Sequence, residues 1–203
     1  MKLSYTSQTV NVRELIEKSV RARRRGEPFT PGEFKKIGRP ALVRRELQRL
    51  ARDGKIKAVA HNVYYKPHER ELFGGMPPVP KIVNALTIKQ GHVVQITGAE
   101  AANRLGLSSQ VPVKSIYLTN GPSRRIVVGK LEVVLRHKPN KELPAAGLVA
   151  GDVIQALRYL GPREVEPSHI EKLSRTLQPE TKARLKKLSR HLPGWLRKII
   201  EQF

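Results

Sequence analysis

The stretch from His92 to His137 reads HVVQITGAEAANRLGLSSQVPVKSIYLTNGPSRRIVVGKLEVVLRH and carries the strongest fold signal in the chain. Its first apolar run, residues 93–96, stops at Thr97, which opens the tetrapeptide T-G-A-E. A side-chain oxygen three residues before a glutamate has the spacing of a helix-capping box. We therefore expect a helix over residues 99–105, ended by Gly106 in a left-handed conformation.

Three further apolar runs follow that helix and have the length and composition of strands. Turn signals separate them, Asn120-Gly121-Pro122 between the first two and Gly129-Lys130 between the last two. The expected strands are residues 113–118, 125–128 and 131–136. Because a β-α-β-β-β unit can bury a helix against a small sheet, this stretch predicts the core of a larger domain in a mixed α/β (α+β) chain.

The N-terminal part of the chain begins with an expected helix over residues 11–25. Asn11 has the side chain of an N-cap, and the apolar residues that follow lie on one helical face. The helix ends in an arginine run that includes Arg23, Arg24 and Arg25. Two interpretations stay open for this run. Cations are favourable at a helix C-terminus, and arginines at such a place can also contact DNA phosphates.

Two more helices are expected before residue 54. Thr30, Pro31 and Glu33 together make a strong helix start, for a short helix that ends at Gly38. The next helix spans residues 40–53. Its apolar stripe is formed by Val43, Leu47 and Leu50. The opposite face and its flanks are basic or polar, with Arg44, Arg45, Gln48, Arg49 and Arg52.

A hairpin is predicted after this third helix. Residues 55–60 and 63–66 alternate like two short strands around His61-Asn62. Three helices and a hairpin describe a winged helix-turn-helix, whose third helix enters the DNA major groove. Arginine can donate two hydrogen bonds to guanine, and glutamine can pair with adenine. The competing interpretation is a charged face that is merely solvated. The residues expected to contact DNA are Arg23, Arg24, Arg25, Arg39, Arg44, Arg45, Gln48, Arg49, Arg52, His61 and Asn62.

Prolines and a glycine pair divide the chain into two domains. The segment from Pro67 to Pro80 holds four prolines and Gly74-Gly75, which is typical of a linker. We expect a winged helix-turn-helix at residues 1–66, a linker at 67–79 and a larger domain at 80–203. A helix over residues 80–90 is expected to lead into the first strand of that domain. Helical patterns return at 149–160, 168–177, 179–192 and 193–203.

The charge of the chain indicates a polyanionic partner. The net charge is +22, and residues 1–75, 76–150 and 151–203 contribute +10, +7 and +5. Nucleic acid is the first candidate for such a partner. The alternative is a basic protein from a basic proteome. No apolar run reaches the roughly 18 residues of a membrane span, no signal peptide is evident, and there is no cysteine. We expect a cytoplasmic protein without a membrane association.

Catalytic, cofactor and metal motifs are not found in the sequence. The six histidines lack ligand-like spacing, so no metal site is expected. No phosphate-binding or dinucleotide fingerprint occurs, so no cofactor is expected. Residues 76–150 contain three carboxylates, Glu100, Glu132 and Glu142, and none forms a D-x-D-like pair. An enzyme that uses metal ions at a reacting phosphate needs clustered carboxylates to hold them. We therefore expect a protein that is not an enzyme.

The central stretch also carries a family resemblance. GAEAANRLGLSSQVPVKSIYLTNGPSRRIVVG, followed by LRH, resembles the central signature of AbiEi-type antitoxins of type IV toxin–antitoxin systems. The similarity extends loosely from Phe29 to Trp195. It implies an N-terminal winged helix that represses the antitoxin's own operon at promoter DNA. It also implies a larger domain that counteracts a nucleotidyltransferase-like toxin, with no stable complex required. Arg125 departs from the smaller or neutral residue expected in relatives.

A second candidate surface lies in this larger domain. Its expected members are Gln110, Ser123, Arg124, Arg125 and Arg136, displayed near one end of the sheet. Toxin neutralisation, RNA contact and ligand binding all stay open for this surface.

Two functions of other classes remain as alternatives to an antitoxin. One is a stand-alone transcription regulator whose second domain binds a small ligand. The other is an RNA-binding protein that uses the basic sheet domain. Single-strand platforms normally stack bases on aromatic side chains, and Tyr117 is the one aromatic residue in the expected strands of this larger domain.

Overall fold

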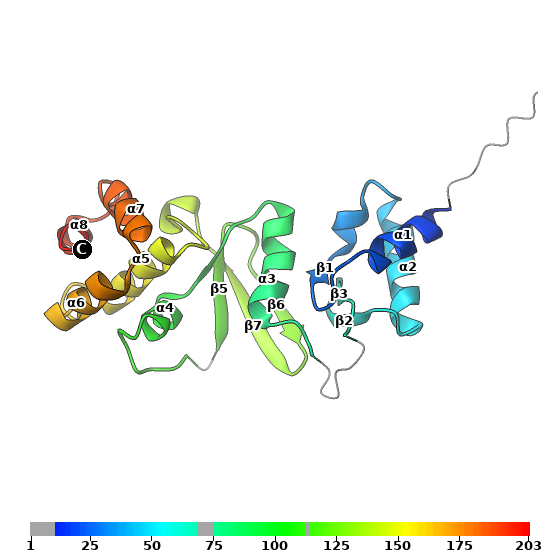
Figure 1. Cartoon of the computed structure of the whole chain (residues 1–203), viewed down its shortest axis with the longest axis horizontal. Helices are drawn as coiled ribbons and strands as arrows, with labels where there is room; N and C mark the ends of the chain where they lie inside the picture. The colour runs from blue at the N-terminus through cyan, green and yellow to red at the C-terminus, as the bar shows by residue number, and fades with distance from the viewer. Residues whose placement is uncertain (1–10, 69–74, 113) are drawn as a thin grey trace, which may run out of the picture. The chain divides into compact units, whose positions relative to one another are not determined.

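The computed structural model describes residues 11–68, 75–112 and 114–203 of the chain. The chain forms two compact units, Met1–Gln90 and Gly91–Phe203. Both combine helices with a small sheet, which confirms the mixed α+β class (Figure 1). Each unit has its own apolar core, and each is described separately below.

The first unit contains a winged helix-turn-helix. Its elements in order are α1 (Val12–Arg21), β1 (Pro28–Phe29), the 3₁₀ helix η1 (Pro31–Phe34), α2 (Pro40–Arg52), β2 (Lys57–Ala60) and β3 (Val63–Tyr65). The three strands form an antiparallel sheet in the order β1-β3-β2. The expected hairpin is therefore confirmed, with His61-Asn62 at its turn. Strand β1 was not predicted, because two residues are too few to show a period.

The core of the first unit explains why α1 and α2 pack together. Ile16 and Val20 of α1 and Leu47 of α2 are all buried in one cluster, together with Phe29 and Phe34. The expected second helix is a single 3₁₀ turn, since only a few residues separate Pro31 from Gly38. Its predicted start is partly confirmed, because the Thr30 N–H donates to the Glu33 carboxylate at 2.8 Å.

The helix α3 (Val79–Thr87) corrects the predicted domain boundary. Together with the 3₁₀ helix η2 (Ile88–Gln90) it belongs to the first unit, whereas we expected it to open the larger domain at Pro80. It contacts β1 and β3, and its Ile82, Val83 and Leu86 are buried. The larger unit therefore begins at Gly91. Residues 69–74 of the expected linker lie outside the described residues.

The second unit has the predicted β-α-β-β-β core. Its elements are β4 (Val94–Ile96), α4 (Gly98–Arg104), β5 (Ser115–Thr119), β6 (Arg124–Val128) and β7 (Leu131–His137). The sheet order is β4-β5-β7-β6, so β7 lies between β5 and β6 and runs parallel to β5. The turn at Asn120 is thus not a hairpin turn. The Asn120 side chain instead accepts a hydrogen bond from the Val93 N–H at 2.8 Å, which ties the turn to β4.

Helices pack beside this sheet and complete the second unit. After the 3₁₀ helix η3 (Asn140–Glu142) come α5 (Val149–Leu160), α6 (Pro167–Thr176), α7 (Pro179–Ser189) and α8 (Gly194–Ile200). Helices α4 and α5 approach closely at Gly98, where an added Cβ would lie 2.5 Å from the Gln155 carbonyl oxygen. The Thr97 side chain makes no cap hydrogen bond, so that part of the predicted capping box is wrong. In the described parts of the chain, no helix combines the length and apolar character needed to cross a membrane.

Candidate nucleic-acid interface

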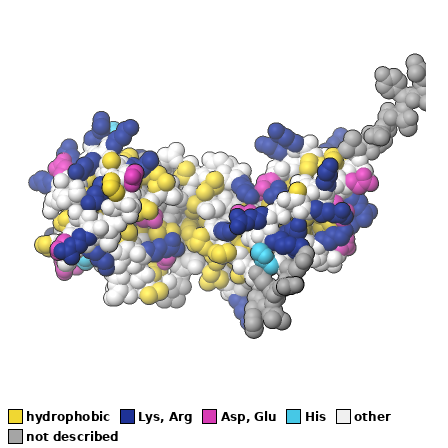
Figure 2. Space-filling model, in the orientation of Figure 1, with side chains coloured by type: hydrophobic (Ala, Val, Ile, Leu, Met, Phe, Trp, Pro, Cys, Tyr) yellow, Lys and Arg dark blue, Asp and Glu magenta, His cyan; other side chains and the backbone are white. Residues whose placement is uncertain are grey.

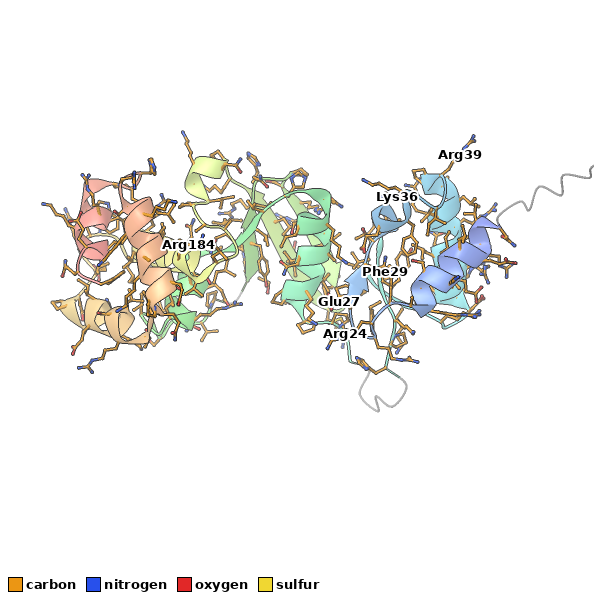
Figure 3. All side chains as sticks on the ribbon, turned by 45° about the horizontal axis from the view of Figure 1, so that its top comes forward. Arg24, Glu27, Phe29, Lys36, Arg39 and Arg184 are labelled. Atoms are coloured by element: carbon orange, nitrogen blue, oxygen red, sulfur yellow. The ribbon has the colours of Figure 1, made fainter. Side chains whose placement is uncertain are left out.

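Helix α2 presents two opposite faces, as the sequence predicts. Val43, Leu47 and Leu50 are at most 1% exposed and pack in the core. The polar face is exposed to solvent, with Arg44, Arg45, Gln48 and Arg52. Arg39 stands at the N-cap of α2 and is also exposed (Figure 3). The helix therefore carries several cations and one amide on a surface that the fold leaves open.

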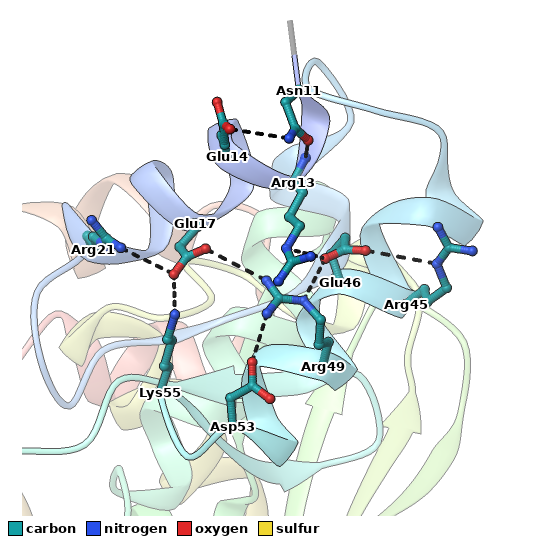
Figure 4. A network of polar contacts seen from close by, with 10 residues as sticks. All are labelled: Asn11, Arg13, Glu14, Glu17, Arg21, Arg45, Glu46, Arg49, Asp53 and Lys55. Carbon is teal, nitrogen blue, oxygen red and sulfur yellow. Dashed lines mark hydrogen bonds and ion pairs between the residues drawn. The ribbon is translucent and has the colours of Figure 1, made fainter.

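A carboxylate in α2 organises the neighbouring arginines. The Glu46 side chain is 10% exposed, and its oxygens lie 2.9 Å from Arg49 Nε, 4.0 Å from Arg13 Nε and 3.9 Å from Arg45 Nε (Figure 4). Arg13 and Arg45 remain 56% and 73% exposed. Both guanidinium groups therefore lie near the Glu46 carboxylate and remain accessible to a partner. Arg13 was not among the expected DNA contacts, because it lies in α1 and only helix packing brings it near Glu46 of α2.

Arg49 differs from the other predicted contacts on α2. Its guanidinium donates to Glu46 and, at 2.7 Å, to Asp53, and it lies 3.7 Å from Glu17 of α1. The hydrogen bond with Glu46 is the largest cause that raises the pKa of Arg49. With three carboxylates around it and only 19% of the side chain exposed, Arg49 joins α1 to α2. Its geometry favours this structural role over the DNA contact that we expected.

The arginine run after α1 is split among several roles. Arg23 donates to Glu33 at 2.8 Å, and its guanidinium carbon lies 4.5 Å from the Phe29 ring centroid. Arg25 donates to the Pro67 carbonyl oxygen at 2.7 Å. Arg24, by contrast, is exposed (Figure 3). Of these three predicted DNA contacts, Arg24 is therefore best placed to reach a phosphate, whereas Arg23 packs against the core of the first unit.

Glu33 is held ionised in this part of the unit. Burial acts to raise its pKa, but hydrogen bonds from the Thr30 N–H, Arg23 and Lys89 lower the pKa below its ordinary value of 4.5. The carboxylate thus links η1, the arginine run and η2.

The hairpin forms a short wing beside α2. His61 is exposed at its tip, and Asn62 adopts a left-handed conformation with φ of 56°. Asparagine tolerates this region better than most residues. The Asn62 amide nitrogen lies 2.8 Å from His61 Nε2. Lys57 on β2 is exposed as well and was missed in the sequence, because a lysine in a short strand carries no distinctive signal.

The structure brings together only part of the second candidate surface. Arg125 pairs across the sheet with Val134, and Arg124 pairs with Leu135. Since neighbouring residues of a strand point to opposite faces, Arg125 and Arg136 share one face and Arg124 lies on the other. Arg125 is 80% exposed and lies 3.5 Å from Glu132.

The polar members of that surface serve local contacts. The Ser123 hydroxyl accepts a hydrogen bond from the His137 N–H at 2.8 Å, which joins the turn to β7. Gln110 accepts one from the Tyr159 hydroxyl of α5 at 3.3 Å. The predicted cluster is therefore divided into an exposed pair, Arg125 and Arg136, and three residues placed elsewhere.

Helices α7 and α8 carry a third group of cations. Figure 2 shows Lys and Arg side chains over the helical end of the second unit, and Figure 3 labels Arg184 on α7. None of these cations forms an ion pair with a carboxylate of the described residues. We name this group the C-terminal basic surface; its exposed members are Arg184, Lys186, Lys187, Arg190, Arg197 and Lys198.

The described residues contain no group of three or more histidine, aspartate or glutamate side chains that could hold a metal ion. Comparison with curated proteins gives no match. No solved structure matches the chain either. Residues 15–185 match the family of unknown function DUF6088. Because this range spans most of the 203 residues, the chain belongs to the DUF6088 family.

Proposed function

We propose that the first unit is a sequence-specific DNA-binding module that reads the major groove with α2. A winged helix-turn-helix places one helix in the major groove, and α2 is the corresponding helix of this unit. The observation that carries the proposal is that α2 exposes a row of hydrogen-bond donors, Arg44, Arg45, Gln48 and Arg52. The opposite face of α2 is fully buried in the core. The helix therefore has one face for folding and another for a partner.

Different residues take different parts in this binding. Arg45 and Gln48 meet base edges, where arginine pairs with guanine and glutamine with adenine. The exposed Arg24 and Arg39 and the wing residue His61 contact phosphates, which fix register without reading sequence. The net charge of +22 supports the phosphate contacts, because such contacts dominate affinity and make it salt-dependent.

We further propose that the protein is a cytoplasmic antitoxin that represses its own operon and counteracts a nucleotidyltransferase-like toxin through the second unit. The resemblance of residues 98–137 to AbiEi-type antitoxins supports this role. A metal-dependent transferase needs clustered carboxylates, and among the described residues no group of three or more His, Asp or Glu side chains could hold a metal ion.

A pair of readouts in cells tests the antitoxin proposal. The Arg44→Ala/Arg45→Ala variant of the full chain should lose repression of a reporter placed behind its own promoter. It should still rescue cells that express the toxin, because the second unit is unchanged. If a folded double variant loses both activities, DNA binding itself is the antidote and the proposed division between the two units is wrong.

The C-terminal basic surface favours one second candidate, RNA binding by the second unit. Its cations lack carboxylate partners among the described residues, so they are available to a phosphate backbone. A filter-binding titration with structured RNA separates the two candidates. The Lys186→Ala/Lys187→Ala variant should weaken RNA binding and leave promoter binding at full strength, whereas no RNA binding by the wild-type chain would remove this candidate.

A further inference from the structure

The first unit carries a groove that has no part in the proposed DNA binding. It has a volume of about 430 Å³ and lies between the C-terminal half of α1, the end of α2 and the residues that follow β3. We call it the amphipathic groove; its lining residues are Glu17, Val20, Arg21, Arg25, Leu50, Gly54, Lys55, Lys66, Pro67 and His68. Pockets for small ligands have volumes of about 300–1,000 Å³.

The lining of the groove combines apolar and cationic side chains. Its apolar residues are Pro67 and two members of the core, Val20 and Leu50, which are 4% and 1% exposed. Four lining residues are cationic, and Glu17 is the one carboxylate among the ten. Arg21 is 76% exposed and Lys55 is 47% exposed. The chemistry of the lining thus matches a ligand with an apolar body and an anionic head.

Hydrogen bonds to the backbone fix part of the cationic lining before any ligand arrives. Lys66 Nζ donates to the Arg21 carbonyl oxygen at 2.6 Å, at the C-terminal end of α1. An ammonium group has three donors, so Lys66 keeps donors for a second acceptor. Preorganised cations bind an anion at a smaller entropic cost than mobile ones.

Glu17 is a carboxylate that already lies among these cations. Its carboxylate accepts hydrogen bonds from both Arg21, at 3.2 Å, and Lys55 (Figure 4). The hydrogen bond from Lys55 is the largest cause that lowers the pKa of Glu17. Arg21 and Lys55 are therefore already paired with Glu17, which also lies 3.7 Å from Arg49. An ammonium group has three N–H donors and a guanidinium group has five. Because both side chains also reach solvent, each keeps donors for a second carboxylate.

We propose that the amphipathic groove binds a small aromatic or branched aliphatic carboxylate. Its head pairs with Arg21, Lys55 and Lys66, and its body covers Val20, Leu50 and Pro67. The site adjoins the end of α2 at Gly54, so it belongs to the same unit as the candidate DNA-reading helix. Ligand binding in this groove does not depend on whether α2 reads DNA.

Three probe molecules test the proposal on the full-length chain by ¹H–¹⁵N NMR titration. Benzoate supplies both features, benzamide has the same ring without the charge, and inorganic phosphate has charge without the ring. Benzoate should shift the amide signals of Val20, Gly54 and Lys55 and bind at least about tenfold more tightly than either other probe. Equal binding of benzoate and benzamide, or shifts confined to other segments, would overturn the proposal.

Matched variants separate this groove from general attraction to a basic protein. Arg21→Ala and Lys55→Ala should each weaken benzoate binding several-fold, and together by about tenfold or more. Lys36→Ala removes one exposed cation outside the groove and should leave benzoate binding unchanged. Because Arg21 is largely exposed, Arg21→Ala should keep a wild-type spectrum. This single variant therefore still tests benzoate binding in the groove if the double variant unfolds. Equal losses in Arg21→Ala and Lys36→Ala would refute the site.

Discussion

Removal of one methylene from each core should show that the two units unfold independently. Ile16 in the first core and Ile154 in the second are both 0% exposed. Ile→Val deletes one buried methylene, which is worth about 0.8 kcal/mol in transfer free energy. A small residual cavity brings the expected loss of stability to about 1 kcal/mol in either variant. With a urea m-value of about 1 kcal/mol/M, the midpoint of the altered unit should fall by about 1 M.

The position of the single tryptophan makes the two transitions separable. Trp195 lies in α8 and packs against the second core, so its fluorescence reports on the second unit. Far-ultraviolet circular dichroism reports on the helices of both. Ile16→Val should shift part of the dichroism curve and leave the tryptophan midpoint in place. Ile154→Val should shift the tryptophan midpoint.

A common response would contradict this account. If Ile16→Val moves the tryptophan midpoint by the same 1 M or so, the two cores unfold as one cooperative body. The separate roles that we propose for the two units would then lack a thermodynamic basis.

Three further changes test the contacts within the units. Glu33→Gln should destabilise the first unit by about 1–2 kcal/mol at pH 7. Because the pKa of Glu33 in the folded state lies below 4.5, the extra stability of the wild type is complete above pH 4.5. In melting curves it should be lost as the pH falls through the lowered folded-state pKa. Asp152→Asn should raise the melting temperature at pH 7, since burial raises the pKa of Asp152 while Gln95 donates to it and acts to lower it. The gain should disappear below pH 3.8, where the wild-type carboxyl is protonated in both the folded and unfolded states, and an unchanged difference across pH would exclude this cause. Gly98→Ala should cost about 1–3 kcal/mol, because its Cβ would lie 2.5 Å from a backbone oxygen of α5; a wild-type melting temperature would show that the helices can separate.

Much of the fold could be predicted because its signals are local. The strand-helix-strands order of residues 94–137 follows from apolar runs and turn residues, and the exposed face of α2 follows from helical spacing. What the sequence did not reveal depends on pairing between distant segments. Strand β7 lies between β5 and β6 and pairs in parallel with β5, and no local sequence pattern encodes that order.

The candidate site was predicted with the same limits. Arg44 and Arg45 could be assigned to a surface from helical spacing alone. Arg49 occupies a similar place in the pattern, yet Glu17 of another helix and Asp53 draw it into an internal network. Arg23 likewise packs over Phe29, a contact that spacing cannot show. A long basic side chain pairs with whichever group the tertiary structure brings near. The sequence therefore indicates where such a residue lies on its helix, but not which group its charged end contacts.

The affinity of the Arg45→Ala variant for specific and random DNA tests the central claim most directly. Titrations of the full chain at several salt concentrations would use its own promoter and a scrambled duplex, with Arg24→Ala as the matched control. If α2 reads bases, Arg45→Ala should cost about 1–3 kcal/mol on the promoter and far less on random DNA. Arg24→Ala should weaken both about equally and lower the salt slope by roughly one unit. An unchanged promoter-to-random ratio in Arg45→Ala would contradict the claim that α2 is the reading helix.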